Sequence, residues 1–159
     1  MTSAPDDAVS IAEVDPTGDV ARHCLQSYYA ELADRFPVGF EVTRSRDPDP
    51  QDLVPPRGAF LVAMSGGRPL GCVALKGSGG GTAEIKRLWI APDARGQGLS
   101  KRLRAAAEAA ARGLSIAVLR LDTNRALPEA SALYRATGWT EIERFNDDPY
   151  AEIFFEKRL

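Results

Sequence analysis

Cysteine and histidine are scarce in this sequence. Its 159 residues include two cysteines and one histidine. Cys24 and Cys72 are far apart and have no metal-ligand spacing, so we interpret them as small buried apolar residues in a reducing environment. His23 has no cysteine or carboxylate at ligand spacing, and we interpret it as a surface residue. These two shortages lead us to expect no metal site.

Excess charge and long apolar runs are also missing. The net charge is −2, and no run of basic residues is interleaved with aromatic ones, so we expect no nucleic-acid partner. No apolar run approaches the roughly 20 residues that span a membrane, and the polar, acidic start is unlike a signal peptide. We therefore expect a cytoplasmic protein without membrane contact.

Length and periodicity predict a single domain. We expect residues 1–7 to form a flexible tail and residues 8–159 one domain, because a chain of 159 residues can bury a substantial core. Hydrophobic periodicity predicts strands at residues 8–14, 59–64, 70–76, 84–90, 115–121, 139–144 and 151–157, and helices at residues 20–36, 98–112 and 127–137. Residues 37–57 are expected to form a long loop with one helical turn.

The order of these elements predicts an α/β (α+β) fold with a mixed sheet. Glycine-containing turns join residues 59–90 into an antiparallel meander. A helix between residues 84–90 and 115–121 predicts that these two strands are parallel. Residues 115–121 are nearly all apolar, which predicts burial on both faces. Residues 153–155 offer an apolar edge through which a homodimer could form.

The chain is organised around a strand, a glycine turn and a helix at residues 83–103. Gly96 and Gly98 precede an alanine-rich helix whose first backbone N–H groups have no partner in the helix, and such a site suits a phosphate. Two common phosphate motifs do not fit. The dinucleotide fingerprint would need glycine where Lys101 stands, and a P-loop would need lysine directly after its last glycine, where Leu99 stands.

The turn resembles the signature of the GNAT superfamily of N-acetyltransferases, Arg/Gln-x-x-Gly-x-Gly/Ala. In this chain the signature reads Arg95-Gly96-Gln97-Gly98-Leu99-Ser100, with serine in place of the final glycine or alanine. The resemblance covers roughly residues 59–145. It implies a mainly antiparallel sheet of six to seven strands with helices on both faces. It also implies transfer of an acetyl group from acetyl-CoA directly to a primary amine.

The resemblance also implies where coenzyme A would bind. The pantetheine arm would lie along the strand that contains Leu88, Trp89 and Ile90, and the pyrophosphate would lie on the glycine turn. The cofactor-binding residues implied at the turn are Arg95, Gly96, Gln97, Gly98, Leu99, Ser100 and Lys101. Many members of the family place an asparagine about seven residues before the tyrosine that corresponds to Tyr134. This chain has Leu127 at that position. Asn124 either takes over that contact or only shapes the approach to the helix.

Two residues that match the family pattern are candidates for proton transfer. Glu84 is the implied base, and strand alternation places it on one face with Lys86, Leu88 and Ile90. The alternative is a solvated charge at the start of the strand, paired with Lys86 or Arg87. Tyr134 is followed four residues later by Gly138 and then by an aromatic residue, which implies that it donates a proton to the coenzyme sulfur. The alternative for Tyr134 is a core aromatic on a helix face.

The acceptor is expected between the first helix, the loop after it and the closing hairpin. Candidate contacts there are Tyr28, Arg35, Phe36 and Asp148, of which Arg35 could bind a carboxylate and Asp148 an ammonium group. The alternative for each of the four is a plain surface residue, which is the more common case. The mixture of charges favours a small amine or an amino acid as acceptor. A protein N-terminus or lysine stays open, as does a non-catalytic acyl-CoA-binding module.

Overall fold

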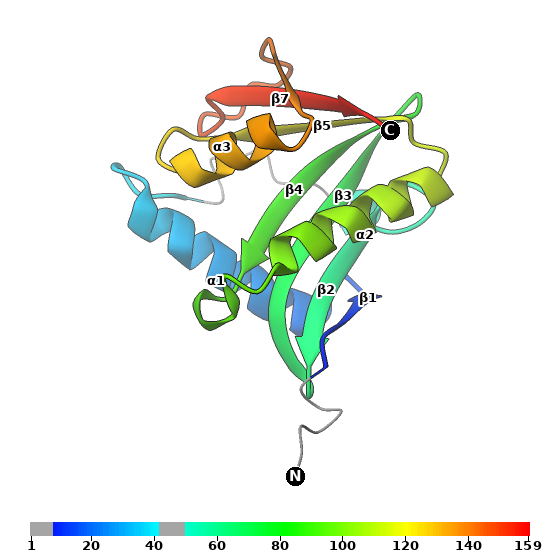
Figure 1. Ribbon diagram of the computed structural model, residues 1–159, viewed down its shortest axis with the longest axis vertical. Coiled ribbons are helices and arrows are strands. Elements are labelled where there is room, and N and C mark those ends of the chain that lie inside the picture. The colour runs from blue at the N-terminus through cyan, green and yellow to red at the C-terminus, as the bar shows by residue number, and fades with distance from the viewer. Residues whose placement is uncertain (1–7, 42–49) are drawn as a thin grey trace.

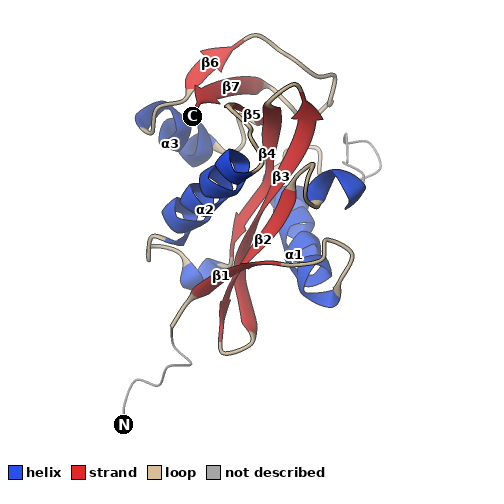
Figure 2. Ribbon diagram, turned by 90° about the vertical axis from the view of Figure 1, so that its right-hand side faces the viewer, coloured by secondary structure: helices blue, strands red, loops and turns tan. Residues whose placement is uncertain are grey.

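The computed structural model describes residues 8–41 and 50–159, which form a seven-stranded sheet with helices on both faces. The strands are β1 (Ser10–Glu13), β2 (Ala59–Ser65), β3 (Arg68–Gly79), β4 (Thr82–Ile90), β5 (Val118–Thr123), β6 (Thr140–Ile142) and β7 (Ile153–Arg158). The α-helices are α1 (Asp19–Arg35), α2 (Leu99–Gly113) and α3 (Pro128–Ala136), and short 3₁₀ turns cover Pro50–Leu53 and Pro92–Ala94. Figure 2 shows α2 and α3 on one face of the sheet and α1 on the other. The element order and the fold class predicted from the sequence are confirmed.

The sheet order is β1-β2-β3-β4-β5-β7-β6, and β4–β5 is its parallel pair. β2, β3 and β4 form the expected antiparallel meander. The β3–β4 hairpin is longer than the apolar pattern indicates, because Gly77 pairs with Ala83 and Gly79 with Thr82. Backbone pairing therefore extends into the glycine run that the sequence predicts to be a turn.

β4 and β5 separate soon after they begin. Their paired residues run from Thr82 and Val118 to Glu84 and Arg120. Beyond that point β4 follows β3, whereas β5 continues beside β7, and Figure 1 shows the two strands diverging. The divergence opens the sheet in its middle, directly beyond Glu84.

A β-bulge at Arg87 corrects the predicted alternation of β4. Cys72 pairs with Trp89 while Ala74 pairs with Lys86, so β4 contains one extra residue, and Arg87 has a left-handed φ of 57°. The extra residue reverses the alternation that follows it. Trp89 therefore lies on the face of Glu84 and Lys86, and the prediction that Leu88 and Ile90 share that face is wrong.

Two further expectations about strands are corrected. The burial of β5 alternates, so β5 is not buried on both faces: Leu119, Leu121 and Thr123 are buried, whereas Val118, Arg120 and Asp122 are half-buried. β5 also continues through Asp122, which the sequence assigns to a loop. Residues 153–155 are not a sheet edge, because β7 pairs with β5 on one side and with β6 on the other. These residues are buried inside the chain, so they offer no apolar edge to a second copy.

The core lies between the sheet and its helices, with Phe60, Leu75, Leu103 and Phe155 fully buried. Cys24 and Cys72 are buried and free, as expected, and His23 is exposed. In residues 8–41 and 50–159 no helix is long and apolar enough to cross a membrane. The same residues contain no cluster of three or more side chains suited to hold a metal ion.

Candidate functional site

The glycine turn presents the start of α2 to a cavity. Gly96 and Gly98 have φ values of 81° and 79°, a left-handed conformation that glycine adopts without strain. Gly98 is the N-cap of α2, and no side chain caps the helix there. The first N–H groups of α2 are therefore available to an external acceptor, at the positive end of the helix dipole.

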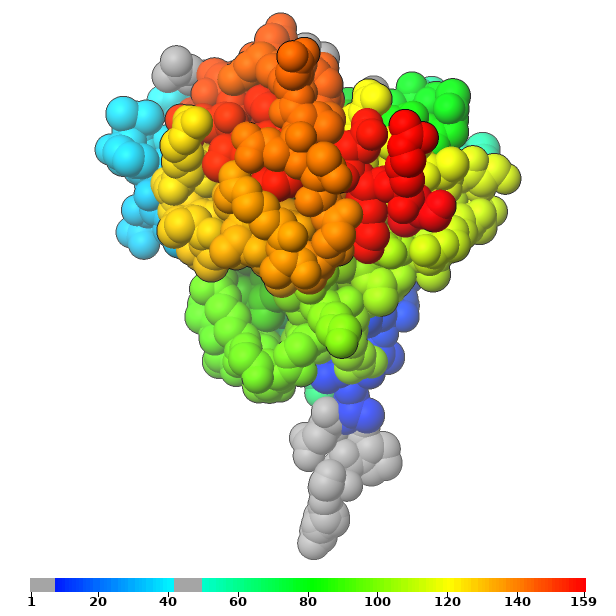
Figure 3. Space-filling view, turned by 45° about the horizontal axis from the view of Figure 1, so that its top comes forward, coloured from blue at the N-terminus to red at the C-terminus, as the bar shows by residue number. Residues whose placement is uncertain are grey.

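A cavity of about 430 Å³ lies between this turn, the end of β4, α1 and α3. Figure 3 shows the face on which α3 (yellow to orange) meets the turn and the start of α2 (green). Of the residues predicted to bind the cofactor, those that line this cavity are Leu88, Trp89, Ile90, Arg95, Gly96, Gly98, Leu99, Ser100 and Tyr134. Gln97, Lys101 and Asn124 are not part of its lining. The cavity thus joins the turn to the strand along which the sequence places the pantetheine arm.

A second, smaller cavity of about 140 Å³ lies where β4 and β5 diverge. Tyr28, Phe36 and Asp148, three of the four predicted acceptor contacts, line it. Arg35 does not. Its guanidinium lies at the larger cavity, where it pairs with Glu129 and donates to the carbonyl of Ala126 at 3.3 Å. The two cavities share the wall residues Tyr28, Leu32, Leu88, Leu127, Ala130 and Tyr134, and therefore lie next to each other.

Tyr134 stands at the junction of the two cavities. Its ring is 7% exposed and packs edge-on against Trp139 and at an angle to Phe155, with centroid distances of 5.6 and 5.7 Å. Burial raises the pKa of Tyr134 to about 12. The hydroxyl therefore keeps its proton at neutral pH, in a residue that lines both cavities.

The matches to known proteins agree with this geometry. Residues 25–139 match the model of the acetyltransferase (GNAT) family. The chain belongs to this family. An IAA acetyltransferase of Azospirillum brasilense is 32% identical over 155 residues, which covers 95% of this chain and 98% of the relative.

Two solved structures show the same GNAT fold. A GNAT-family acetyltransferase from Staphylococcus aureus Mu50 has a TM-score of 0.83 at 16% identity, covering 95% of this chain and 99% of that one. The PaiA N-acetyltransferase from Thermoplasma acidophilum, solved in complex with coenzyme A, has a TM-score of 0.71 at 18% identity, covering 96% and 99%. The split sheet and the glycine turn of this chain are thus set in the GNAT architecture.

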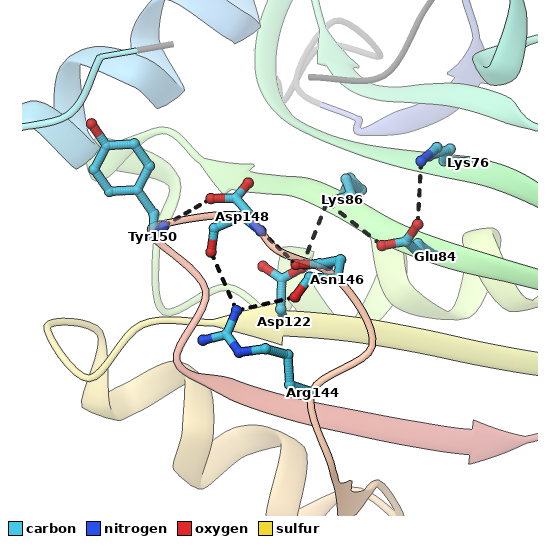
Figure 4. A network of polar contacts seen from close by, with 8 residues as sticks. All are labelled: Lys76, Glu84, Lys86, Asp122, Arg144, Asn146, Asp148 and Tyr150. Carbon is cyan, nitrogen blue, oxygen red and sulfur yellow. Dashed lines mark hydrogen bonds and ion pairs between the residues drawn. The ribbon is translucent and has the colours of Figure 1, made fainter. Parts of the chain in front are cut away.

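A polar network connects side chains of β3, β4 and β5 with the loop before β7 (Figure 4). Glu84 is 8% exposed, and its carboxylate lies 3.4 Å from the Lys76 ammonium and 3.6 Å from the Lys86 ammonium. Lys86 also lies 3.6 Å from Asp122, which accepts a 2.9 Å hydrogen bond from Asn146. Glu84 is not among the residues that line either cavity, whereas Lys86 and Asp122 line the smaller one.

The amide of Asn124 is engaged within the protein. Its Nδ2 donates to the carbonyl of Tyr150 at 2.9 Å, and its Oδ1 accepts from the N–H of Ala126 at 2.8 Å. Leu127, in the position where many relatives have asparagine, lines both cavities. Asn124 therefore fixes the start of α3 through Ala126 and holds the loop before β7 through Tyr150. It also lines the smaller cavity.

Sequence reasoning assigned no site role to three charged residues of the smaller cavity: Lys86, Arg87 and Asp122. The apolar run ends at Leu121 and so predicts a loop at Asp122; continued alternation from Leu119 and Leu121 places Asp122 on the opposite face of β5. Arg87 was missed because the bulge that turns it into the cavity depends on pairing with β3. No residue pattern within β4 predicts that bulge.

Proposed function

We propose that this chain is an acetyl-CoA-dependent N-acetyltransferase that acetylates the primary amine of a small molecule. The observation that supports this most is a pair of adjacent cavities that share Tyr134 as a wall residue. The larger is walled by the glycine turn, as a diphosphate-bearing cofactor requires. The smaller, at about 140 Å³, is below the roughly 300–1,000 Å³ of pockets for drug-sized ligands, which favours a small acceptor.

The residues present fit coenzyme A. The left-handed glycines leave the start of α2 open, and no side chain competes for its N–H groups. We propose that the N–H groups near Gly98 and Ser100 bind the diphosphate and that the end of β4 binds the pantetheine arm. When bound, acetyl-CoA supplies the activated thioester; the backbone of Leu88, which lines both cavities, would hold its carbonyl at their junction.

The protein must then manage two protons. The acceptor ammonium has to lose one before its nitrogen can attack, and the departing thiolate has to gain one. Tyr134 is the proposed donor to sulfur, since burial keeps it protonated. The proposed proton acceptor is one of the two carboxylates beside Lys86: Glu84, which the family resemblance indicates, or Asp122, which lines the cavity. A water molecule would connect either of them to the amine.

The test is an acetyl-CoA assay against a panel of amines, with thiol release followed in time and products identified by mass. We expect acetylation of at least one small amine and none of a lysine-containing peptide. Acetylation of peptides alone would favour a protein acetyltransferase. Tight coenzyme binding with no transfer to any amine, and no effect of Glu84→Gln, Asp122→Asn or Tyr134→Phe on that binding, would favour a non-catalytic acyl-CoA-binding module.

A further inference from the structure

We propose that the acceptor carries a carboxylate as well as its amine, and that Arg87 binds this carboxylate in the smaller cavity. The inference rests on the proposed function, because it names the class of molecule that the acceptor side of the same site takes. It places the carboxylate-binding role predicted for Arg35 on a residue of β4 instead. Arg35 lies at the larger cavity, next to Glu31 and Glu129.

Arg87 is a buried cation in an aromatic chamber. It is 8% exposed and lines the smaller cavity, and its guanidinium lies 5.9 Å from the ring centroid of Tyr29. The other cation of the cavity, Lys86, is held between Glu84 and Asp122 at 3.6 Å from each. Lys86 thus belongs to the carboxylate network, and the Arg87 guanidinium lies by the Tyr29 ring at the wall of the smaller cavity.

The backbone of Arg87 points to a role for its side chain. A φ of 57° is uncommon for any residue other than glycine, asparagine or aspartate, and an arginine in that conformation is strained. Glycine would form the same bulge without strain. Strained positions of this kind cluster where a side chain serves a site. The bulge turns this side chain into the cavity that Leu88 and Tyr134 also line.

The remaining walls define the rest of the acceptor. Phe40 stacks on Tyr29 and lies 4.6 Å from the ring centroid of Tyr150, so the middle of the chamber suits an apolar or aromatic body. Asp122 and Asp148 supply negative charge for an ammonium group. A guanidinium at one place and carboxylates at another match the two charged groups of a free amino acid. A lysine side chain within a protein has no such carboxylate.

The experiment compares amines that differ only in the carboxylate. The pairs are phenylalanine with phenethylamine, tyrosine with tyramine and leucine with isopentylamine, each assayed with wild-type protein, Arg87→Gln and Arg87→Lys. We expect at least one acid of the panel to have a kcat/KM about ten- to a hundredfold above that of its partner, the range given by a charged hydrogen bond. Arg87→Gln should remove most of that preference and change the rates with the carboxylate-free amines less than threefold.

The control is Arg112→Gln, which removes an exposed arginine at the far end of α2 and should leave both rates unchanged. Arg87→Gly guards against misfolding, because glycine accepts the bulge conformation. It should melt no lower than Arg87→Gln and show the same loss of preference. Equal loss with acids and amines in every Arg87 variant would mean that Arg87 only supports the fold, and would overturn the inference.

Failure of the inference can be told from failure of the proposed function. Transfer to amines with no preference for their carboxylate partners overturns the inference and leaves the acetyltransferase intact. If no compound is acetylated, calorimetry with the coenzyme A complex decides: phenylalanine must bind at least tenfold more tightly than phenethylamine, and Arg87→Gln must abolish the difference. Equal binding of the two overturns the inference, and absence of coenzyme A binding overturns the proposed function.

Discussion

Glu84 and Asp122 flank a single cation, the Lys86 ammonium, which lies 3.6 Å from Glu84 Oε1 and 3.6 Å from Asp122 Oδ2. The two carboxylates come from parallel neighbours, β4 and β5, at the place where the strands begin to diverge. Glu84 also pairs with Lys76, whereas Asp122 accepts a hydrogen bond from Asn146 (Figure 4). The pair is therefore asymmetric: Asp122 lines the smaller cavity, whereas Glu84 lines neither cavity.

This asymmetry predicts that replacing Asp122 by asparagine and Glu84 by glutamine will lower activity to different extents. Asp122→Asn should lower kcat/KM about a hundredfold, the size expected when a positioned base is lost. Glu84→Gln should lower it less than tenfold, since Glu84 would act only through Lys86. Initial rates with one good amine, measured from pH 6 to 9, test the order. A larger loss in Glu84→Gln would instead assign the base to the residue that the family resemblance indicates.

Removing the Tyr134 hydroxyl should slow turnover and spare coenzyme binding. Tyr134→Phe keeps the ring packed on Trp139 and Phe155 but removes the proposed proton donor. We expect kcat to fall about a hundredfold or more while the Kd for coenzyme A changes less than threefold. Arg135→Gln is the control, because this exposed side chain of the same helix lines neither cavity and should leave both quantities unchanged. Unchanged turnover in Tyr134→Phe would remove Tyr134 from the mechanism.

The parts of the site that could be predicted from the sequence are those set by local chemistry. Gly96 and Gly98 precede an alanine-rich helix, and this order alone predicts an open helix start. Tyr134 was found through the short motif around Gly138, and the structure places it at the junction of both cavities. In each case the residues that decide the geometry lie within a few positions of one another.

The parts that could not be predicted depend on pairing between distant segments. The bulge that turns Arg87 into the cavity arises from the register of β4 against β3, with Cys72 opposite Trp89. Asp122 enters the site because β5 continues beside β7 after leaving β4. Apolar periodicity shows which face of a strand is buried, but it does not show where two strands diverge.

A methyl group at Gly98 should weaken coenzyme binding more than its effect on folding explains. A Cβ there meets no protein atom within 4 Å, so Gly98→Ala encounters strain only from its φ of 79°, at roughly 1 kcal/mol. The same methyl group would stand where the diphosphate is proposed to approach, and we expect at least a tenfold rise in the Kd for coenzyme A. Gly113→Ala, in open space at the other end of α2, should leave that Kd unchanged. Equal affinities would move the diphosphate away from the turn.

Stability at alkaline pH should depend on Tyr134. Burial raises the pKa of Tyr134 in the folded protein to about 12, above its unfolded value of 10.0, so the folded state holds this proton more tightly. The resulting stabilisation is complete below pH 10 and is lost as the pH rises toward 12. Between pH 9 and 11 the loss should be roughly 1 kcal/mol, because one pKa unit corresponds to about 1.4 kcal/mol.

Urea unfolding at pH 8, 9, 10 and 11 should therefore give a shallower decline in the free energy of unfolding for Tyr134→Phe than for wild type. Tyr28→Phe should also flatten the decline, since burial raises the pKa of Tyr28 in the same direction. Parallel declines in all three proteins would show that the Tyr134 hydroxyl ionises as freely in the folded state as in the unfolded chain.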